Sequence, residues 1–477
     1  MLFNSIEFLI FFPLVTALYF LLPHAWRWGL LLVASCVFYM FFIPYYIVIL
    51  FITILIDYFA GIWIERSDGK KKKRYLWFSI ISTCLVLFVF KYYNFFIGNF
   101  NHVAELIGWN YSMDVLKIVL PIGLSFHTFQ SLSYVIEVYR GNQKAEHHFG
   151  IYALYVMFYP QLVAGPIERP QNILHQFYEK HTVTYSNFSD GFKLIIWGLF
   201  KKVVIADNLS MIVNLVYDSP ETMPWYWLLI ASYLFAVQIY CDFSGYSDMA
   251  IGTARVMGFR LMENFNTPYI STSIREFWSR WHISLSTWFR DYVYIPLGGN
   301  RVSEWKMNRN LLVVFAVSGF WHGANWTYVI WGALHGMYLV IENMLRKFSW
   351  FNWYVNNKQF FVRLLASLVI FQIVVIGWIF FRAENVTDAY YIIKSIFTLN
   401  STQAGLPEDL QMFGIPGLAW KILLALSFLI YDPLLHNLTR NEYKVGSYLR
   451  LMVYSVLAAM ILLLGFWGEV EFIYFQF

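Results

Sequence analysis

The sequence predicts an all-α integral membrane protein. Apolar segments of about 20 residues, the length that crosses a bilayer, recur along the 477-residue chain. Hydrophobic residues make up 59% of the chain and charged residues 13%, whereas soluble domains carry about 25% charged residues. The 46 Phe, 34 Tyr and 20 Trp fit a large bundle with aromatic side chains at both membrane interfaces. Because spanning-length apolar runs recur throughout, a soluble protein with a large apolar core is a poor alternative.

Apolar segments that are candidate membrane helices extend from the first residues to the C-terminal region. They lie near residues 6–22, 29–45, 47–64, 76–97, 115–138, 191–205, 225–241, 309–325, 327–344, 362–381, 417–434 and 450–468. Residues 145–190 and 242–305 are too polar for simple spans but rich in aromatic residues and glycine, so we expect interfacial or re-entrant helices there. Without repeats or soluble segments, we expect one membrane domain over residues 1–477.

The distribution of charge predicts the orientation of the chain in the membrane. The net charge is +5, and its one dense basic cluster is Lys-Lys-Lys-Lys-Arg at residues 70–74, in a short loop between apolar segments. Basic loops are enriched on the cytoplasmic side. Counting back from this loop, with Arg27 also inside, places the N-terminus outside. No basic stripe suited to nucleic acid is present.

Cysteine and histidine spacing does not predict a metal site. Cys36, Cys84 and Cys241 form no Cys-x-x-Cys motif, and we see no i, i+4 histidine pair with a nearby acid, as in zinc hydrolases. We also find no Gly-x-Ser-x-Gly elbow, Walker loop or dinucleotide fingerprint. We therefore expect no bound metal and no permanently bound cofactor.

One histidine lies where a membrane helix is predicted. His322 belongs to Trp-His-Gly-Ala-Asn-Trp at residues 321–326. An apolar run over residues 311–320 leads into this motif, and a second apolar run, which contains His335, follows it. An ionisable residue at membrane depth is costly and marks a functional site by default. We therefore expect His322 to have a functional role.

The most polar internal segment, residues 275–301, predicts a helix with a functional face. Arg275, Trp278 and His282 have the spacing of one helix face, which could line a cavity. The alternative is an interfacial helix whose arginines reach lipid headgroups. Upstream, Asp242 and Asp248 directly follow an apolar span. We favour a structural role for them, at a helix start capped by Ser or Asp.

Several multi-residue motifs follow one another in a fixed order. The main elements are Phe-Trp-x-Arg-Trp-His-Ile-Ser-Leu-Ser at 277–286, Ile-Pro-Leu-Gly-Gly-Asn-Arg at 295–301 and Ser-Gly-Phe-Trp-His-Gly-Ala-Asn-Trp at 318–326. Further elements lie at residues 121–126, 161–167, 242–248, 377–382 and 472–477. Together they resemble the membrane-bound O-acyltransferase (MBOAT) family, in particular its bacterial alginate O-acetyltransferase branch, over nearly the whole chain.

The resemblance implies a bundle of about eleven transmembrane helices plus re-entrant or interfacial helices around a central tunnel. The essential histidine of the family maps onto His322. The histidine of the Trp-His-Ile-Ser motif in the teichoic-acid D-alanylation branch maps onto His282. Ser279 stands where many relatives carry a larger polar or basic residue, which leaves the contacts around the tunnel open.

The activity implied by the resemblance is transfer of an acetyl group across the bacterial cytoplasmic (inner) membrane. The donor would be acetyl-CoA or an acyl-carrier thioester, and the acceptor the hydroxyls of an extracytoplasmic, alginate-like polysaccharide. Transfer would be direct or through an SGNH-hydrolase-like partner outside the membrane. Peptidoglycan O-acetylation and teichoic-acid D-alanylation are alternatives within the family, and a polysaccharide transporter or flippase or a secretion scaffold are alternatives outside it.

The resemblance also assigns roles to individual side chains. His322 would act either as the general base or as a covalent acyl carrier. His282 would orient the acyl group or stabilise the developing oxyanion. Arg275, Arg280 and Arg301 are candidates for binding the CoA phosphates.

Overall fold

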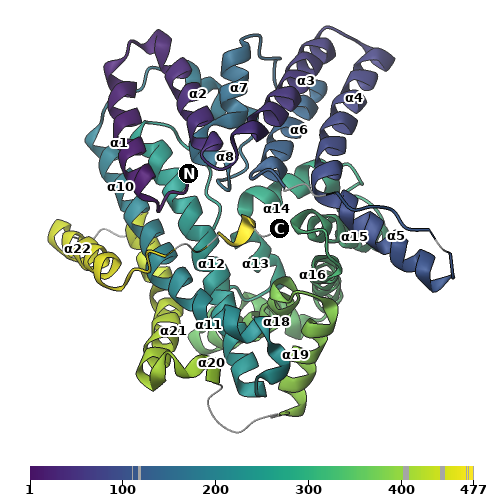
Figure 1. Ribbon diagram of the computed structural model, residues 1–477, viewed down its shortest axis with the longest axis vertical. Coiled ribbons are helices and arrows are strands. Elements are labelled where there is room, and N and C mark those ends of the chain that lie inside the picture. Colours follow the sequence, from purple (N-terminus) through teal and green to yellow (C-terminus); the bar gives the residue numbers. More distant parts are fainter. Residues whose placement is uncertain are drawn as a thin grey trace. The chain divides into compact units, whose positions relative to one another are not determined.

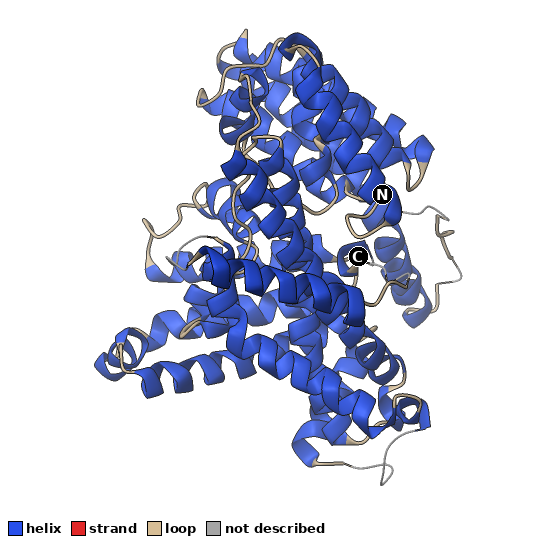
Figure 2. Ribbon diagram, turned by 90° about the vertical axis from the view of Figure 1, so that its left-hand side faces the viewer, coloured by secondary structure: helices blue, strands red, loops and turns tan. Residues whose placement is uncertain are grey.

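The computed structural model describes residues 1–109, 111–116, 120–400, 408–440, 446–468, 470 and 472–475. Every regular element in these ranges is a helix, and Figure 2 shows no strand among them. The prediction of an all-α protein is therefore confirmed. The chain divides into two compact units, residues 1–192 with 250–262, and residues 193–249 with 263–477. The expectation of one membrane domain stays a prediction.

The first unit is built mainly from the N-terminal helices (Figure 1). Long helices alternate with short helical turns, as expected for a bundle with interfacial segments. The α-helices are α1 (Ile6–Leu21), α2 (His24–Met40), α3 (Ile47–Glu65), α4 (Gly69–Leu87), α5 (Tyr93–Leu106), α6 (Leu124–Arg140), α7 (Phe149–Met157), α8 (Tyr159–Leu162) and α9 (Pro170–Ile173). The π-helix η2 (Phe88–Tyr92) joins α4 to α5, and 3₁₀ turns lie at η1 (Pro44–Tyr46) and η3 (Leu174–Tyr178).

The second unit contains most of the remaining helices. Two helices connect the units through the chain, namely α10 (Tyr185–Leu199) and α12 (Trp225–Val256). The other α-helices are α11 (Asp207–Asp218), α13 (Ile274–Arg280), α14 (Ile283–Phe289), α15 (Glu304–His322), α16 (Trp326–Leu345), α17 (Ser349–Asn356), α18 (Phe360–Arg382), α19 (Val386–Thr398), α20 (Glu408–Gln411), α21 (Gly414–Thr439) and α22 (Ser447–Leu464). Short helices are η4 (Phe200–Ala206), η5 (Pro220–Thr222), η6 (Pro268–Ile270), η7 (Arg290–Tyr294) and η8 (Ile473–Phe475), of which η4 and η7 are π-helices.

Several helices have the length and composition of membrane spans. Among the described residues, five helical segments are long and apolar enough to cross a bilayer, and α1 and α22 are shorter apolar helices. The five segments are Pro44–Glu65, Gly69–Leu106, Trp225–Val256, Phe360–Arg382 and Gly414–Thr439. The chain is a multi-pass membrane protein. The count of about eleven spans, and the tunnel that they would surround, stay predictions.

Exposed apolar side chains show which helix faces suit lipid. Ile10 on α1 is 67% exposed, Ile430 on α21 is 72% exposed and Leu463 on α22 is 81% exposed. Large exposed apolar surfaces are unfavourable in water but match acyl chains. These faces therefore fit contact with the bilayer.

Two expected helix starts are wrong. The segment predicted from residue 115 begins its helix, α6, at Leu124, and residues 117–119 lie outside the described residues. Asp242, which we expected at a helix start, lies inside the 32-residue helix α12. Its carboxylate has a buried cationic partner, Lys202, at 2.7 Å. A paired carboxylate is tolerated in a buried helix interior, so the polar motif does not interrupt the helix.

Two glycines bring α15 and α16 into close contact. A Cβ added to Gly319 would lie 2.3 Å from the carbonyl oxygen of Tyr328, and a Cβ on Gly332 would lie 2.3 Å from that of Phe315. Small residues at helix interfaces let backbones approach and pack tightly in membranes. The pair therefore determines how close the C-terminal end of α15, which carries His322, lies to α16.

We predict that Gly319→Ala lowers the free energy of unfolding by about 1–3 kcal/mol, because the added methyl group overpacks this contact. Thermal unfolding of the purified protein in detergent measures the effect. The control is Gly29→Ala on α2, where no atom lies within 4 Å of the added Cβ. Equal melting temperatures for the two variants would contradict the prediction.

Candidate active site

His322 is the last residue of α15 and is only 4% exposed. The helix ends there because Gly323 adopts extended backbone angles, with φ −162° and ψ 150°. Three aromatic rings surround the imidazole, those of Trp321 and Trp331, each at 4.9 Å between ring centroids, and Phe381 at 5.4 Å. The histidine predicted to be functional is therefore enclosed by apolar rings.

His282 lies at a break between α13 and α14, with its backbone in the left-handed region at φ 43° and ψ 55°. Asn264 holds this turn, since its carbonyl oxygen accepts the N–H of Ile283 at 2.9 Å and its side-chain oxygen accepts the hydroxyl of Ser284 at 2.9 Å. The side chain of His282 is 1% exposed.

The predicted helix face containing Arg275, Trp278 and His282 is wrong. Helix α13 ends at Arg280, because Trp281 is extended and His282 is left-handed. Trp278 packs instead against His335, with ring centroids 5.1 Å apart. The spacing of these residues predicted one continuous helix. Because the helix breaks before His282, this residue does not share a helix face with Arg275 and Trp278.

The structure brings the two predicted histidines together. The ring centroids of His282 and His322 are 6.5 Å apart. Phe243 of α12 packs edge-on against His282 at 4.6 Å. The site is thus assembled from segments that lie far apart in the sequence but belong to one compact unit.

A tyrosine from the C-terminal segment completes the cluster. The ring of Tyr474 in η8 lies 5.7 Å from His322, 6.1 Å from His282 and 4.1 Å from Phe243. Figure 1 draws this short helix in yellow at the C-terminal end of the chain. Sequence reasoning noted the aromatic motif at residues 472–477 but did not place Tyr474 in the site. Gln476 and Phe477 of that motif lie outside the described residues.

Burial determines the charge state of His282. It lowers the pKa of this imidazole to about 3, because the surroundings offer little solvation to the protonated form. His282 is therefore neutral near pH 7. A neutral imidazole carries one N–H donor and one acceptor nitrogen, so it can donate a hydrogen bond or accept a proton.

Two of the three predicted donor-binding arginines are engaged by protein groups. Arg280 pairs with Glu276 at 3.0 Å and donates to the carbonyl oxygen of Asn266 at 3.1 Å. Arg275 is exposed and donates to the side-chain oxygen of Asn343 at 2.6 Å. Arg301 is exposed and follows Gly298 and Gly299, both of which have positive φ. Their role with CoA phosphates stays a prediction.

His335 is a third buried histidine near this cluster. It is 0% exposed, and its Nε2 lies 2.7 Å from where a Cβ on Gly377 would stand. Trp331 lies between His335 and His322, with ring centroids 5.1 Å and 4.9 Å away, respectively. A side chain at position 377 would force this imidazole to move.

Buried imidazoles beside apolar rings in a multi-pass membrane protein fit the class of membrane-embedded transferases. Comparison with known proteins identifies the family. The family model "MBOAT, membrane-bound O-acyltransferase family" matches residues 147–381, a range that includes both His282 and His322. The chain belongs to the membrane-bound O-acyltransferase family, in its alginate O-acetyltransferase-like branch. It is an O-acetyltransferase.

The curated relatives cover most of this chain and of their own length. A Pseudomonas aeruginosa protein named "Probable alginate O-acetylase AlgI" is 41% identical over 84% of this chain and 76% of its own. The protein of the same name from Azotobacter vinelandii is 41% identical over 83% and 78%. The peptidoglycan O-acetyltransferase of Helicobacter pylori is 37% identical over 80% and 75%.

We predict that His282→Gly is more stable than His282→Ala. Both variants lose the imidazole, but alanine must keep a left-handed backbone that costs a residue with a Cβ about 1 kcal/mol or more. Thermal unfolding in detergent compares them directly. An alanine variant as stable as the glycine variant would show that the turn relaxes without His282.

Proposed function

We propose that this enzyme moves an acetyl group from a cytoplasmic thioester, acetyl-CoA, to hydroxyls of an extracytoplasmic polysaccharide, with His322 at the centre of transfer. The observation that carries the proposal is the pairing of His322 with His282 among buried aromatic rings, 6.5 Å apart. Such surroundings strengthen electrostatic interactions and limit hydrolysis of the donor.

In the first form of the mechanism, His322 is a general base. The acceptor hydroxyl oxygen attacks the thioester carbonyl carbon while the imidazole takes the hydroxyl proton. The carbon–sulfur bond then breaks, and the proton passes to the departing thiolate. The products are the acetyl ester and the free thiol.

In the second form, His322 carries the acetyl group. An imidazole nitrogen attacks the thioester, and the thiol leaves with the proton that the ring loses. The acceptor hydroxyl then attacks the acetyl-imidazole, and its proton returns to the ring. Both forms need a neutral imidazole at the start.

His282 is proposed to orient the acetyl group or to stabilise the oxyanion. In its neutral form it has one N–H to donate to a carbonyl oxygen that gains negative charge during attack. The left-handed turn, held by Asn264, fixes the direction of this ring before the donor binds. Arg275, Arg280 and Arg301 are proposed contacts for the CoA phosphates, because guanidinium groups pair well with phosphate oxygens.

An alginate-like polysaccharide is the proposed acceptor, supported by the names of the P. aeruginosa and A. vinelandii relatives. Peptidoglycan is the second candidate acceptor, supported by the H. pylori relative. We place the enzyme in the bacterial inner membrane with its N-terminus outside, because the basic loop at residues 70–74 favours the cytoplasm. Final transfer through an SGNH-hydrolase-like partner outside the membrane is part of the proposal.

We predict that His322→Ala abolishes acetyl transfer without preventing membrane insertion, because the transfer chemistry depends on this imidazole. The measurement follows radiolabelled acetyl-CoA in vesicles that contain the purified enzyme and acceptor polysaccharide. A folded variant that acetylates the acceptor normally would refute the assignment. Transport of unmodified polysaccharide without acetyl transfer would favour a transporter.

We predict that His282→Ala lowers the rate constant of transfer by about tenfold or more, while the affinity for acetyl-CoA changes little. The reason is that an oxyanion contact forms mainly in the transition state. Binding of acetyl-CoA and single-turnover transfer are measured on the same preparation. Loss of donor affinity with an unchanged rate constant would instead assign His282 to donor binding.

A further inference from the structure

A buried carboxylate on α12 binds the backbone of the C-terminal segment. The side chain of Asp242 accepts a hydrogen bond from the N–H of Ile473 at 2.8 Å, across 231 residues of sequence. Both residues are buried, at 2% and 5% exposure. Hydrogen bonds to a charged acceptor are stronger than neutral ones, particularly where water does not compete.

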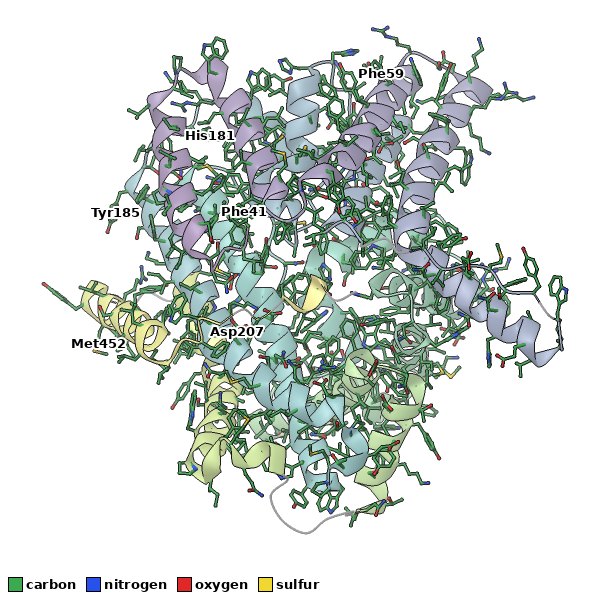
Figure 3. All side chains as sticks on the ribbon, in the orientation of Figure 1. Phe41, Phe59, His181, Tyr185, Asp207 and Met452 are labelled. Carbon is green, nitrogen blue, oxygen red and sulfur yellow. The ribbon has the colours of Figure 1, made fainter. Side chains whose placement is uncertain are left out.

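Asp242 belongs to a buried triad of ionisable side chains. The ammonium of Lys202 lies 2.7 Å from the Oδ1 of Asp242 and 2.9 Å from the Oδ1 of Asp207. Figure 3 labels Asp207 of α11 among the side chains of the helices. Two carboxylates share one ammonium, so the triad carries an excess of negative charge when all three groups are ionised. The N–H of Ile473 supplies a further donor to Asp242.

Close helix packing makes the triad possible. Gly198 and Gly245 face each other, since a Cβ on Gly198 would lie 2.5 Å from the carbonyl oxygen of Gly245. The chain after Gly198 continues into the π-helix η4, which carries Lys202. A methyl group at Gly198 or Gly245 would push this segment away from α12, because the contact leaves no room for it.

The same segment places aromatic rings on the histidine site. Tyr474 directly follows Ile473 and contacts Phe243 at 4.1 Å, and Phe243 directly follows Asp242 and contacts His282 at 4.6 Å. The hydrogen bond between Asp242 and Ile473 therefore joins two neighbouring pairs of residues, one on α12 and one on η8. Movement of η8 would remove Tyr474 from both imidazoles.

We propose that Asp242 is a positioning residue that anchors the C-terminal segment against the histidine site. The proposal rests on the proposed function of His322 and His282. Asp242 acts through Ile473, whose placement keeps the ring of Tyr474 on the two imidazoles and closes the site. Lys202 pairs with the same carboxylate at 2.7 Å and so helps to fix its position.

Asp207 provides a matched control. Asp207 pairs with the same ammonium and is 1% exposed. The hydrogen bond to Ile473, however, is made by Asp242. A purely structural role of the triad predicts similar effects for Asp207→Ala and Asp242→Ala. The anchoring role predicts that Asp242→Ala alone releases the C-terminal segment.

The first experiment measures access to position 473. Ile473→Cys is introduced into the full-length protein after Cys36, Cys84 and Cys241 are replaced by serine or alanine, and maleimide labelling is followed in detergent. We expect slow labelling, faster by about tenfold or more with Asp242→Ala because a charged hydrogen bond is lost. With Asp207→Ala we expect labelling to stay slow. Equal acceleration by both variants would overturn the proposal.

The second experiment removes the donor of the hydrogen bond instead of its acceptor. Ile473→Pro deletes the N–H and leaves the triad intact, so it also applies if Asp242→Ala fails to fold. We expect each variant to lower kcat for acetyl transfer by about tenfold, with little change in KM for acetyl-CoA. Because both remove one interaction, the double variant should lose no more activity than either single variant. A loss of activity in the double variant equal to the product of the two single losses would contradict the anchoring role of Asp242.

Two further variants separate failure of the anchor from failure of the proposed function. His322→Ala, combined with Ile473→Cys, should lose acetyl transfer while the introduced thiol stays slowly labelled, since the imidazole takes no part in the bond to Asp242. Asp242→Asn keeps an oxygen acceptor and should keep labelling slow. Fast labelling in Asp242→Asn would show that the ion pair, and not the hydrogen bond to Ile473, holds the segment.

Discussion

The cost of burying ionisable groups in a membrane protein governs this structure. Lys202 lies within 3 Å of two carboxylates, and Lys201 pairs with Asp248 at 2.5 Å. An isolated charge at such depth would cost several kcal/mol, so each must have a partner. The pairs bring η4, α11 and α12 together, and through Asp242 they also reach the C-terminal segment. Asp242 thereby links these ion pairs to the segment that carries Tyr474.

Different backbone features place the two histidines in the site. His322 lies at the end of α15, whose approach to α16 is set by Gly319 and Gly332. His282 lies at a left-handed residue in a turn held by Asn264. One position therefore depends on helix packing and the other on local hydrogen bonds, and the two rings meet 6.5 Å apart. Substitutions that disturb either the helix packing or the turn are expected to separate the two imidazole rings.

The aromatic surroundings have a chemical consequence for acyl transfer. Rings such as Trp331 and Phe381 pack against His322, and Phe243 packs against His282. Burial lowers the pKa of His282, so the neutral form of this imidazole is favoured. A neutral imidazole is the form that can take a proton or attack a thioester. The packing of the site thus supports its proposed chemistry.

Composition and motifs were sufficient to predict an all-α membrane protein and its family, because hydropathy, helical length and contiguous motifs are local properties of the chain. The functional role of His322 stays a prediction. Composition and motifs did not predict the break before His282, the interior position of Asp242 or the presence of Tyr474 beside both histidines. Helical spacing assumes a continuous helix, whereas a left-handed residue redirects it. A hydrogen bond across 231 residues leaves no local pattern, and only tertiary folding brings Asp242 and Ile473 together.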